Sequence, residues 1–254
     1  MNHKLTWMKT PQIDHKSSKI NFLKLGLEFL VIFSSIFISF YIEDVRKVNE
    51  NSLIKNELIG DLISTVEDDL NQLKNVQDIL QNSEKLIQEI LNDIDNSHSQ
   101  LSDIETINKI LGIEVGFSFF SKDGIFNQLI STGTFELIKN EELKKNLLDL
   151  FNHQKDRNTA SSNEIDSFNL IFRNEMNKNF RIRFSYNSFD GEFYGSRALM
   201  NSNFDEKYYF SNSFYGLISQ AQQYVNMYMR QLKDIEENYK TVYALSKEEV
   251  KKDI

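Results

Sequence analysis

The sequence predicts an all-α protein built from long helices, with one strongly apolar segment near its N-terminus. Only one proline and nine glycines occur among 254 residues. A shortage of helix breakers favours long helices over turn-rich sheets. Along most of the chain, apolar residues recur every three or four positions, as they do on one face of a helix. We therefore expect a transmembrane helix that continues into a long stalk helix, followed by an antiparallel helical bundle.

The apolar segment covers residues 25–42 and reads LGLEFLVIFSSIFISFYI. A helix of this length measures about 27 Å, close to the hydrocarbon thickness of a bilayer. Its one ionisable side chain is Glu28, and its phenylalanines are spread over the helix so that no polar stripe remains. The pattern predicts a transmembrane helix.

The charges on either side of this segment predict its orientation. Residues 1–24 contain five lysines and one aspartate, whereas Glu43 and Asp44 follow the segment directly. Because basic flanks stay in the cytoplasm, residues 1–24 are expected to form a cytoplasmic tail and residues 43–254 an extracytoplasmic helical domain. No small-x-small cleavage site follows Tyr41, so we expect an uncleaved, single-pass signal anchor in the inner membrane, with the bulk of the chain in the periplasm.

Glu28 has two interpretations, because a carboxylate inside an apolar span is costly. It can reach the nearby interface or pair with Lys24 one turn earlier. Alternatively, it can make an intramembrane polar contact between anchor helices, together with Ser34 and Ser35, whose small side chains permit close approach.

Beyond the anchor, the stalk seam is expected to break at the turn formers of residues 95–99. Residues 101–133 read as short helices and turns, in which Ser102 and Glu105 form a capping pattern and Gly133 follows a helix end. Asn140 is expected to cap a second long helix that runs to about Lys178, with a weak stretch at residues 158–163.

The end of the chain holds two contrasting segments. Residues 180–215 contain twelve aromatics and are expected to be irregular or to form short elements. Residues 214–242 repeat apolar positions at spacings of four and three, which predicts a coiled-coil-like helix. Periodicity does not decide whether these heptads pair within one chain or between chains.

Two motifs resemble those of a family of bacterial single-pass membrane proteins, typical of Bacteroidota, that share a domain of unknown function. The first is the glutamate of the span, here Glu28 in GLEFLVIF. The second is L-x-S-[ST]-G-x-[FL]-x-L-I-x-N-x-x-L, matched by residues 129–143. The resemblance covers residues 20–155 and departs at residues 41–44, where members often carry Asn-Trp-Asn. It implies the anchor topology and no particular chemistry.

The sequence offers little chemistry. His3, His15, His98 and His153 are each far in sequence from other plausible metal ligands, and there are no cysteines. Catalytic, metal and cofactor motifs are lacking, so we expect neither an enzyme nor a cofactor. The net charge of −8 disfavours nucleic acid as a partner of the main domain.

The remaining interpretation is a membrane-anchored helical interaction or scaffold protein of the cell envelope. Its expected partners are the lipid bilayer and either another protein or further copies of itself. The alternative is an extracytoplasmic ligand-sensing module that acts through a partner protein. Because Tyr, Phe and Arg are common at interfaces, the candidate partner surface consists of Phe189, Phe193, Tyr194, Arg197, Tyr208 and Tyr209. Packing of these aromatics over the end of the bundle is the competing explanation.

Overall fold

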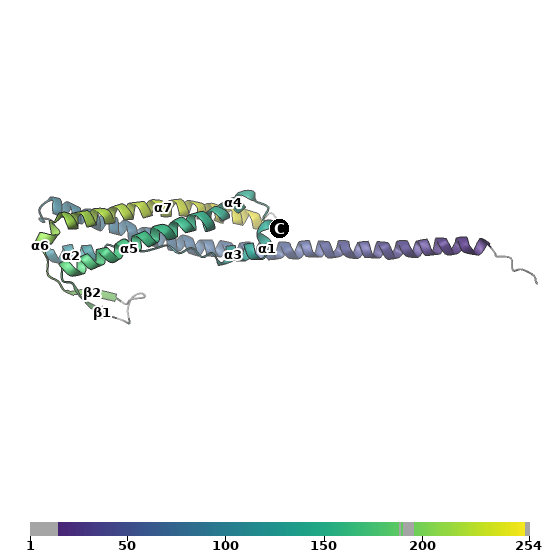
Figure 1. The fold of residues 1–254 in the computed structure, drawn as a ribbon, viewed down its shortest axis with the longest axis horizontal. Coiled ribbons are helices and arrows are strands. Elements are labelled where there is room, and N and C mark those ends of the chain that lie inside the picture. The colour runs from purple at the N-terminus through teal and green to yellow at the C-terminus, as the bar shows by residue number, and fades with distance from the viewer. Residues whose placement is uncertain (1–14, 188, 190–195, 252–254) are drawn as a thin grey trace, which may run out of the picture. The chain divides into compact units, whose positions relative to one another are not determined.

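In the part of the chain that the structure describes, the protein is all-α apart from one small hairpin, as the composition predicts (Figure 1). The computed structural model describes residues 15–187, 189 and 196–251. The chain divides into two compact units, Met1–Leu53 and Ile54–Ile254.

The first unit contains the start of the longest helix, α1 (His15–Asp95). Every side chain from Phe22 to Ile42 is exposed. In the described part of the chain, α1 is the one helix that is long and apolar enough to cross a membrane, and none of its most apolar 18-residue window is buried. The core helix of a soluble protein would bury most of such a window.

The second unit is an antiparallel bundle of three long helices: the later part of α1, α5 (Lys155–Asn179) and α7 (Asn212–Lys251). Figure 1 shows α5 and α7 lying side by side. α7 runs antiparallel to α1, because Gln77 of α1 contacts Glu236 of α7 whereas the later Glu84 of α1 contacts the earlier Gln222 of α7. The shorter elements are α2 (Asp103–Leu111), α3 (Gly124–Ser131), the 3-10 helix η1 (Thr134–Leu137), α4 (Glu141–Leu148), the π-helical turn η2 (Asp149–Gln154), β1 (Arg183–Asn187), β2 (Ser196–Asn201) and α6 (Glu206–Tyr209).

The apolar seam of α7 forms the centre of the core. All nine predicted seam positions are buried, and they pack against the other elements of the same chain. Burial of each large side chain contributes about 1.5–3 kcal/mol, so this seam is a main source of stability. The seam residues are Phe214, Ile218, Ala221, Val225, Tyr228, Leu232, Ile235, Tyr239 and Val242.

The predicted helix ends are confirmed. α1 ends at Asp95, where Ser97 and His98 take positive φ values of 57° and 55°. Gly133 has φ 72° after α3, and the Asn140 side chain accepts hydrogen bonds from the backbone of the first turn of α4. The motif of residues 129–143 therefore forms the joint between α3, η1 and α4.

A buried ion pair connects residues 129–143 with α1 and α7. Nζ of Lys55 lies 3.0 Å from Oε1 of Glu249, and both side chains are almost fully buried. The Glu249 carboxylate also accepts hydrogen bonds from the backbone N–H groups of Lys139 and Asn140. Burial alone would raise the pKa of Glu249, but these N–H groups and Lys55 hold that pKa below its usual value.

Two details differ from the sequence-based expectation. The weak stretch at residues 158–163 stays helical, because the buried Asn158 amide donates to the Phe119 carbonyl and accepts from the Tyr228 hydroxyl. The irregularity of this long helix lies earlier, in η2. Residues 180–215, which were expected to be irregular or to form short elements, include an antiparallel hairpin of the short strands β1 and β2.

The second difference concerns residues 112–123, which are neither helical nor part of a sheet. This connecting segment runs along α1. At its start the N–H of Glu114 donates to the Ser83 hydroxyl, and near its end the N–H of Lys122 donates to the Asp69 carboxylate. Its buried side chains, among them Val115 and Phe119, take a place in the core that a helix would otherwise fill. The sequence predicted short helices and turns over residues 101–133, and it did not predict this extended course along α1.

Candidate functional site

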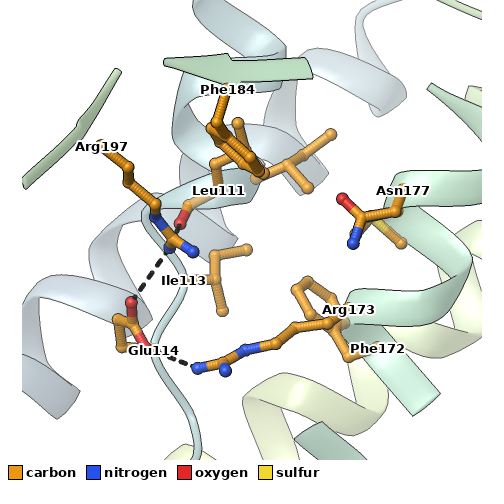
Figure 2. Close-up of a pocket in the computed structure, with 10 residues that line it drawn as sticks. Leu111, Ile113, Glu114, Phe172, Arg173, Asn177, Phe184 and Arg197 are labelled. Atoms are coloured by element: carbon orange, nitrogen blue, oxygen red, sulfur yellow. Dashed lines mark hydrogen bonds and ion pairs between the residues drawn. The ribbon is translucent and has the colours of Figure 1, made fainter. Parts of the chain in front are cut away.

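A small cavity of about 50 Å³ lies where α2, α5, the connecting segment and the hairpin meet (Figure 2). We call it the arginine cavity, because Arg173 of α5 and Arg197 of β2 both line it. Its other lining residues are Ile110, Leu111, Ile113, Glu114, Phe172, Met176, Asn177 and Phe184. Figure 2 shows the Asn177 amide turned toward this space.

One carboxylate serves both arginines of the cavity. Oε2 of Glu114 lies 3.4 Å from Nη2 of Arg173, and Oε1 lies 3.5 Å from Nη2 of Arg197. These distances are long and the guanidinium groups are about half exposed, so each pair adds little stability. Two positive charges face one negative charge, which leaves one guanidinium charge uncompensated within the lining.

The walls of the arginine cavity combine that charge with apolar surface. The Phe184 ring lies under the Arg197 guanidinium, with 5.2 Å between the ring centroid and Cζ. Such cation–π contacts orient a guanidinium without neutralising it. Buried side chains of α2 and α5, including Ile110 and Phe172, form the base. The cavity suits a small, negatively charged group attached to an apolar one.

An open groove of about 670 Å³ begins on the other side of Arg173. We call it the apolar groove: α1 lines one wall from Gln72 to Ile79, α5 lines the other from Asp166 to Arg173, and residues 116–120 form the floor. Three large side chains project there into solvent, with exposed fractions of 41% for Phe117, 70% for Phe120 and 70% for Leu170. Clustered exposed apolar side chains of this kind mark interaction sites.

Side chains from all three long helices fix the floor of the groove. The Phe119 N–H donates to the Tyr228 hydroxyl at 2.9 Å, and its carbonyl accepts from Asn158 at 2.8 Å. The Phe120 N–H donates to Gln72 at 2.9 Å. These hydrogen bonds hold the backbone that carries Phe117 and Phe120 in place. The binding of a partner therefore costs little conformational entropy in this segment.

A second polar cluster surrounds His98 at the corner after α1. Nδ1 faces Oδ2 of the buried Asp93 and Nε2 faces Oδ1 of Asp103, at 2.6 and 3.0 Å. The Tyr209 hydroxyl donates to Asp93, and Phe204 stacks on the imidazole. The two ring nitrogens face different carboxylates on opposite sides, and no group of residues in the described part of the chain is arranged to hold a metal ion. The sequence analysis treated His98 as isolated from possible partners, but in the fold it bridges the carboxylates of Asp93 and Asp103. Its role is therefore structural.

The described residues of the predicted partner surface lie in different environments. Arg197 lines the arginine cavity, and Phe189 is fully exposed. Tyr209 is fully buried and Tyr208 packs against the core, so packing over the bundle end accounts for both. Phe193 and Tyr194 lie outside the described residues.

The polar residues of the apolar segment lie on exposed surface in the first unit. Glu28 and Ser35 are seven residues apart and share a helix face, whereas Ser34 lies on another face. The Ser35 hydroxyl donates to the Val31 carbonyl of its own helix at 2.7 Å. Ser39, which the sequence analysis did not single out, lies eleven residues after Glu28 and therefore also shares its face.

Arg173, Glu114 and the exposed floor of the groove were missed by the sequence analysis. Arg173 sits in the polar part of a helix, where an isolated arginine is usually solvated surface. Its partner Glu114 is 59 residues away, and only the fold brings the two together. The usable signal was the apolar stretch Val115–Phe120, which has too many aromatics for a solvated loop.

No family model matches the chain, and no curated protein or solved structure is significantly similar to it.

Proposed function

We propose that the protein is a membrane-anchored interaction protein whose helical unit presents a binding surface to another protein of the cell envelope. The observation that supports this most directly is the apolar window of α1, none of which is buried. Exposed apolar surface of that length requires an apolar surrounding, and a bilayer supplies it over about 27 Å of helix.

The charge distribution supports an orientation for this anchor. The five lysines of residues 1–24 precede the apolar segment, and acidic residues follow it. In the proposed topology the N-terminal tail lies in the cytoplasm and residues 43–254 lie in the periplasm. Membership of the resembled anchor family stays a prediction, and the proposal does not depend on it.

The second unit supports a binding role because its exposed apolar side chains gather beside unbalanced positive charge. Phe117, Phe120 and Leu170 lie along the apolar groove, which adjoins Arg173. A surface of this composition, aromatic and arginine-containing, is typical of the centres of protein interfaces.

A ligand-sensing role is the second candidate, and the arginine cavity is the observation that favours it. Its volume of about 50 Å³ admits only a few atoms, so a sensed ligand would be a small carboxylate. In that role the protein would pass the signal to a separate partner.

The anchor and its orientation are tested by fusing reporters after Ile254 in a bacterial host and extracting the membranes with alkaline carbonate. We expect activity from a reporter that folds only outside the cytoplasm, and retention of the full chain in the extracted membranes. A matched variant with two charges in the span, Ile32→Lys and Ile36→Lys, should be released into the soluble fraction. Release of the unaltered chain would contradict the anchor, and activity of a cytoplasmic reporter would contradict the orientation.

A further inference from the structure

We propose that the apolar groove and the arginine cavity form one binding site for a polypeptide segment of a partner protein, apolar in its middle and carrying a carboxylate at one end. The carboxylate enters between Arg173 and Arg197, and the apolar side chains lie over Phe117, Phe120 and Leu170. The inference rests on the proposed interaction role and names the surface and partner chemistry for it.

The two recesses adjoin at Arg173, which lines both of them. Glu114 lines the cavity, and Gly116 begins the floor of the groove only two residues later. A ligand that covers the groove as far as Arg173 therefore lies next to the cavity. The groove volume falls within the range of about 300–1,000 Å³ that is usual for binding sites.

Charge determines which end of the segment meets the cavity. Arg173 and Arg197 share the single carboxylate of Glu114, so a second carboxylate can pair with the guanidinium charge left over. The cavity of about 50 Å³ exceeds the roughly 10–15 Å³ that a cavity needs to hold one water molecule, which leaves room for a carboxylate head. Arginine binds carboxylates in a bidentate geometry, and the Asn177 amide faces the same space.

An acidic side chain, Asp166, lies at the opposite end of the groove and favours a polypeptide over a fatty acid as the ligand. Asp166 lies seven residues before Arg173 on α5, which places the two side chains about 10 Å apart along the helix. A ligand that matches both ends carries a positive group about 10 Å from its carboxylate, with apolar groups between them. A polypeptide can supply this pattern with ordinary side chains, whereas a fatty acid has no positive group.

The test is selection of a phage-displayed library of random twelve-residue peptides on the full chain in lipid nanodiscs, with empty nanodiscs used for subtraction. We expect enriched peptides to combine apolar residues with Asp, Glu or a free C-terminal carboxylate. Dissociation constants of synthetic copies, measured by fluorescence anisotropy, should rise at least tenfold for Arg173→Glu, for Arg197→Glu and for Phe120→Ser.

The matched control is Arg157→Glu, which makes the same charge change at an exposed position of the same helix, away from the site. It should leave affinity unchanged. Replacing the acidic residue of a selected peptide by lysine should abolish binding to the unaltered chain and restore part of it with Arg173→Glu. Because Phe120 is 70% exposed, its replacement tests the groove with little risk to folding.

Three results would overturn the proposal: no enrichment above empty nanodiscs, equal binding to the Arg173 and Arg157 variants, or saturable binding of sodium palmitate or acetate that displaces the selected peptides. The last result would assign the site to a lipid or a small carboxylate. Failure of this test leaves the reporter and carbonate results unaffected, so loss of this inference is distinguishable from loss of the proposed function.

Discussion

Nδ1 of His98 lies 2.6 Å from Oδ2 of Asp93, which is fully buried near the end of α1. The other oxygen of Asp93 accepts hydrogen bonds from the N–H groups of Gln100 and Leu101, at 2.9 and 3.0 Å. Asp93 thereby organises the whole corner between α1 and α2. The imidazole shields this carboxylate from solvent and compensates its charge.

The stability of this corner should depend on pH through His98. Burial alone would lower the pKa of His98, but the hydrogen bonds that its ring N–H groups donate to Asp93 and Asp103 raise that pKa above its usual value. A raised pKa in the folded state stabilises the fold fully below about pH 6.5, and that contribution is lost as the pH rises through the folded-state pKa. We expect the thermal unfolding midpoint of the full chain in detergent, followed by near-UV circular dichroism, to fall from pH 6 to pH 8.5.

His98→Gln provides the control for this pH dependence. At pH 6 it should lower the free energy of unfolding by about 1–3 kcal/mol, because a charge-assisted hydrogen bond to a buried carboxylate is lost. The variant should also flatten the change between pH 6 and pH 8.5. An unchanged slope in the variant would show that another group causes the pH dependence.

Glu249→Ala should be among the most destabilising single substitutions in the second unit. It removes the acceptor of the buried Lys55 ammonium and of the backbone N–H groups of Lys139 and Asn140. Breaking a buried ion pair at one partner costs about 3–5 kcal/mol. Urea unfolding monitored by circular dichroism measures the loss. Glu248→Ala, at the exposed neighbouring position, should change stability by less than about 0.5 kcal/mol.

Features that depend on neighbouring residues were predicted well. The seam of α7 follows from apolar spacing alone, and all nine of its positions are buried. Gly133 and Asn140 act through their own backbone and side-chain geometry, so their positions in the sequence indicated a helix end and a helix start. The end of α1 near residues 95–99 was predicted for the same reason.

Features that depend on distant residues could not be predicted in this way. Residues 112–123 lie along the core because Ser83, Asn158 and Tyr228 satisfy their backbone groups from 31 to 109 positions away. No local pattern encodes such partners. Of the candidate binding site, Arg197 was anticipated because it lies in an aromatic-rich segment, whereas Arg173 became a candidate only when the fold placed it beside Glu114.

Gly116→Ala should destabilise the protein through a clash in the floor of the apolar groove. A Cβ at this position would lie 2.3 Å from Nδ2 of Asn169 and 2.8 Å from its Cγ. Asn169 is itself buried, and its Cβ would lie 3.1 Å from the added methyl group, so rotation of the amide alone does not relieve the crowding. We expect a loss of about 1–3 kcal/mol in urea unfolding, as for other overpacked sites. Adding Asn169→Ala should recover part of the loss, and strictly additive effects of the two substitutions would contradict a direct clash.

Gly133→Ala tests whether the joint of residues 129–143 requires the left-handed backbone of its glycine. Gly133 has φ 72° and open space around its Cα, so an added methyl group meets no neighbour and only the backbone conformation resists it. The left-handed region costs a non-glycine residue about 1–2 kcal/mol, and we expect the free energy of unfolding to fall by that amount.

Gly124→Ala is the matched control, because Gly124 also has open space but lies in α3 without a positive φ. Alanine should be neutral or slightly stabilising there, since it is the better helix former. Equal losses at both positions would show that the left-handed backbone of Gly133 is not the cause of the destabilisation.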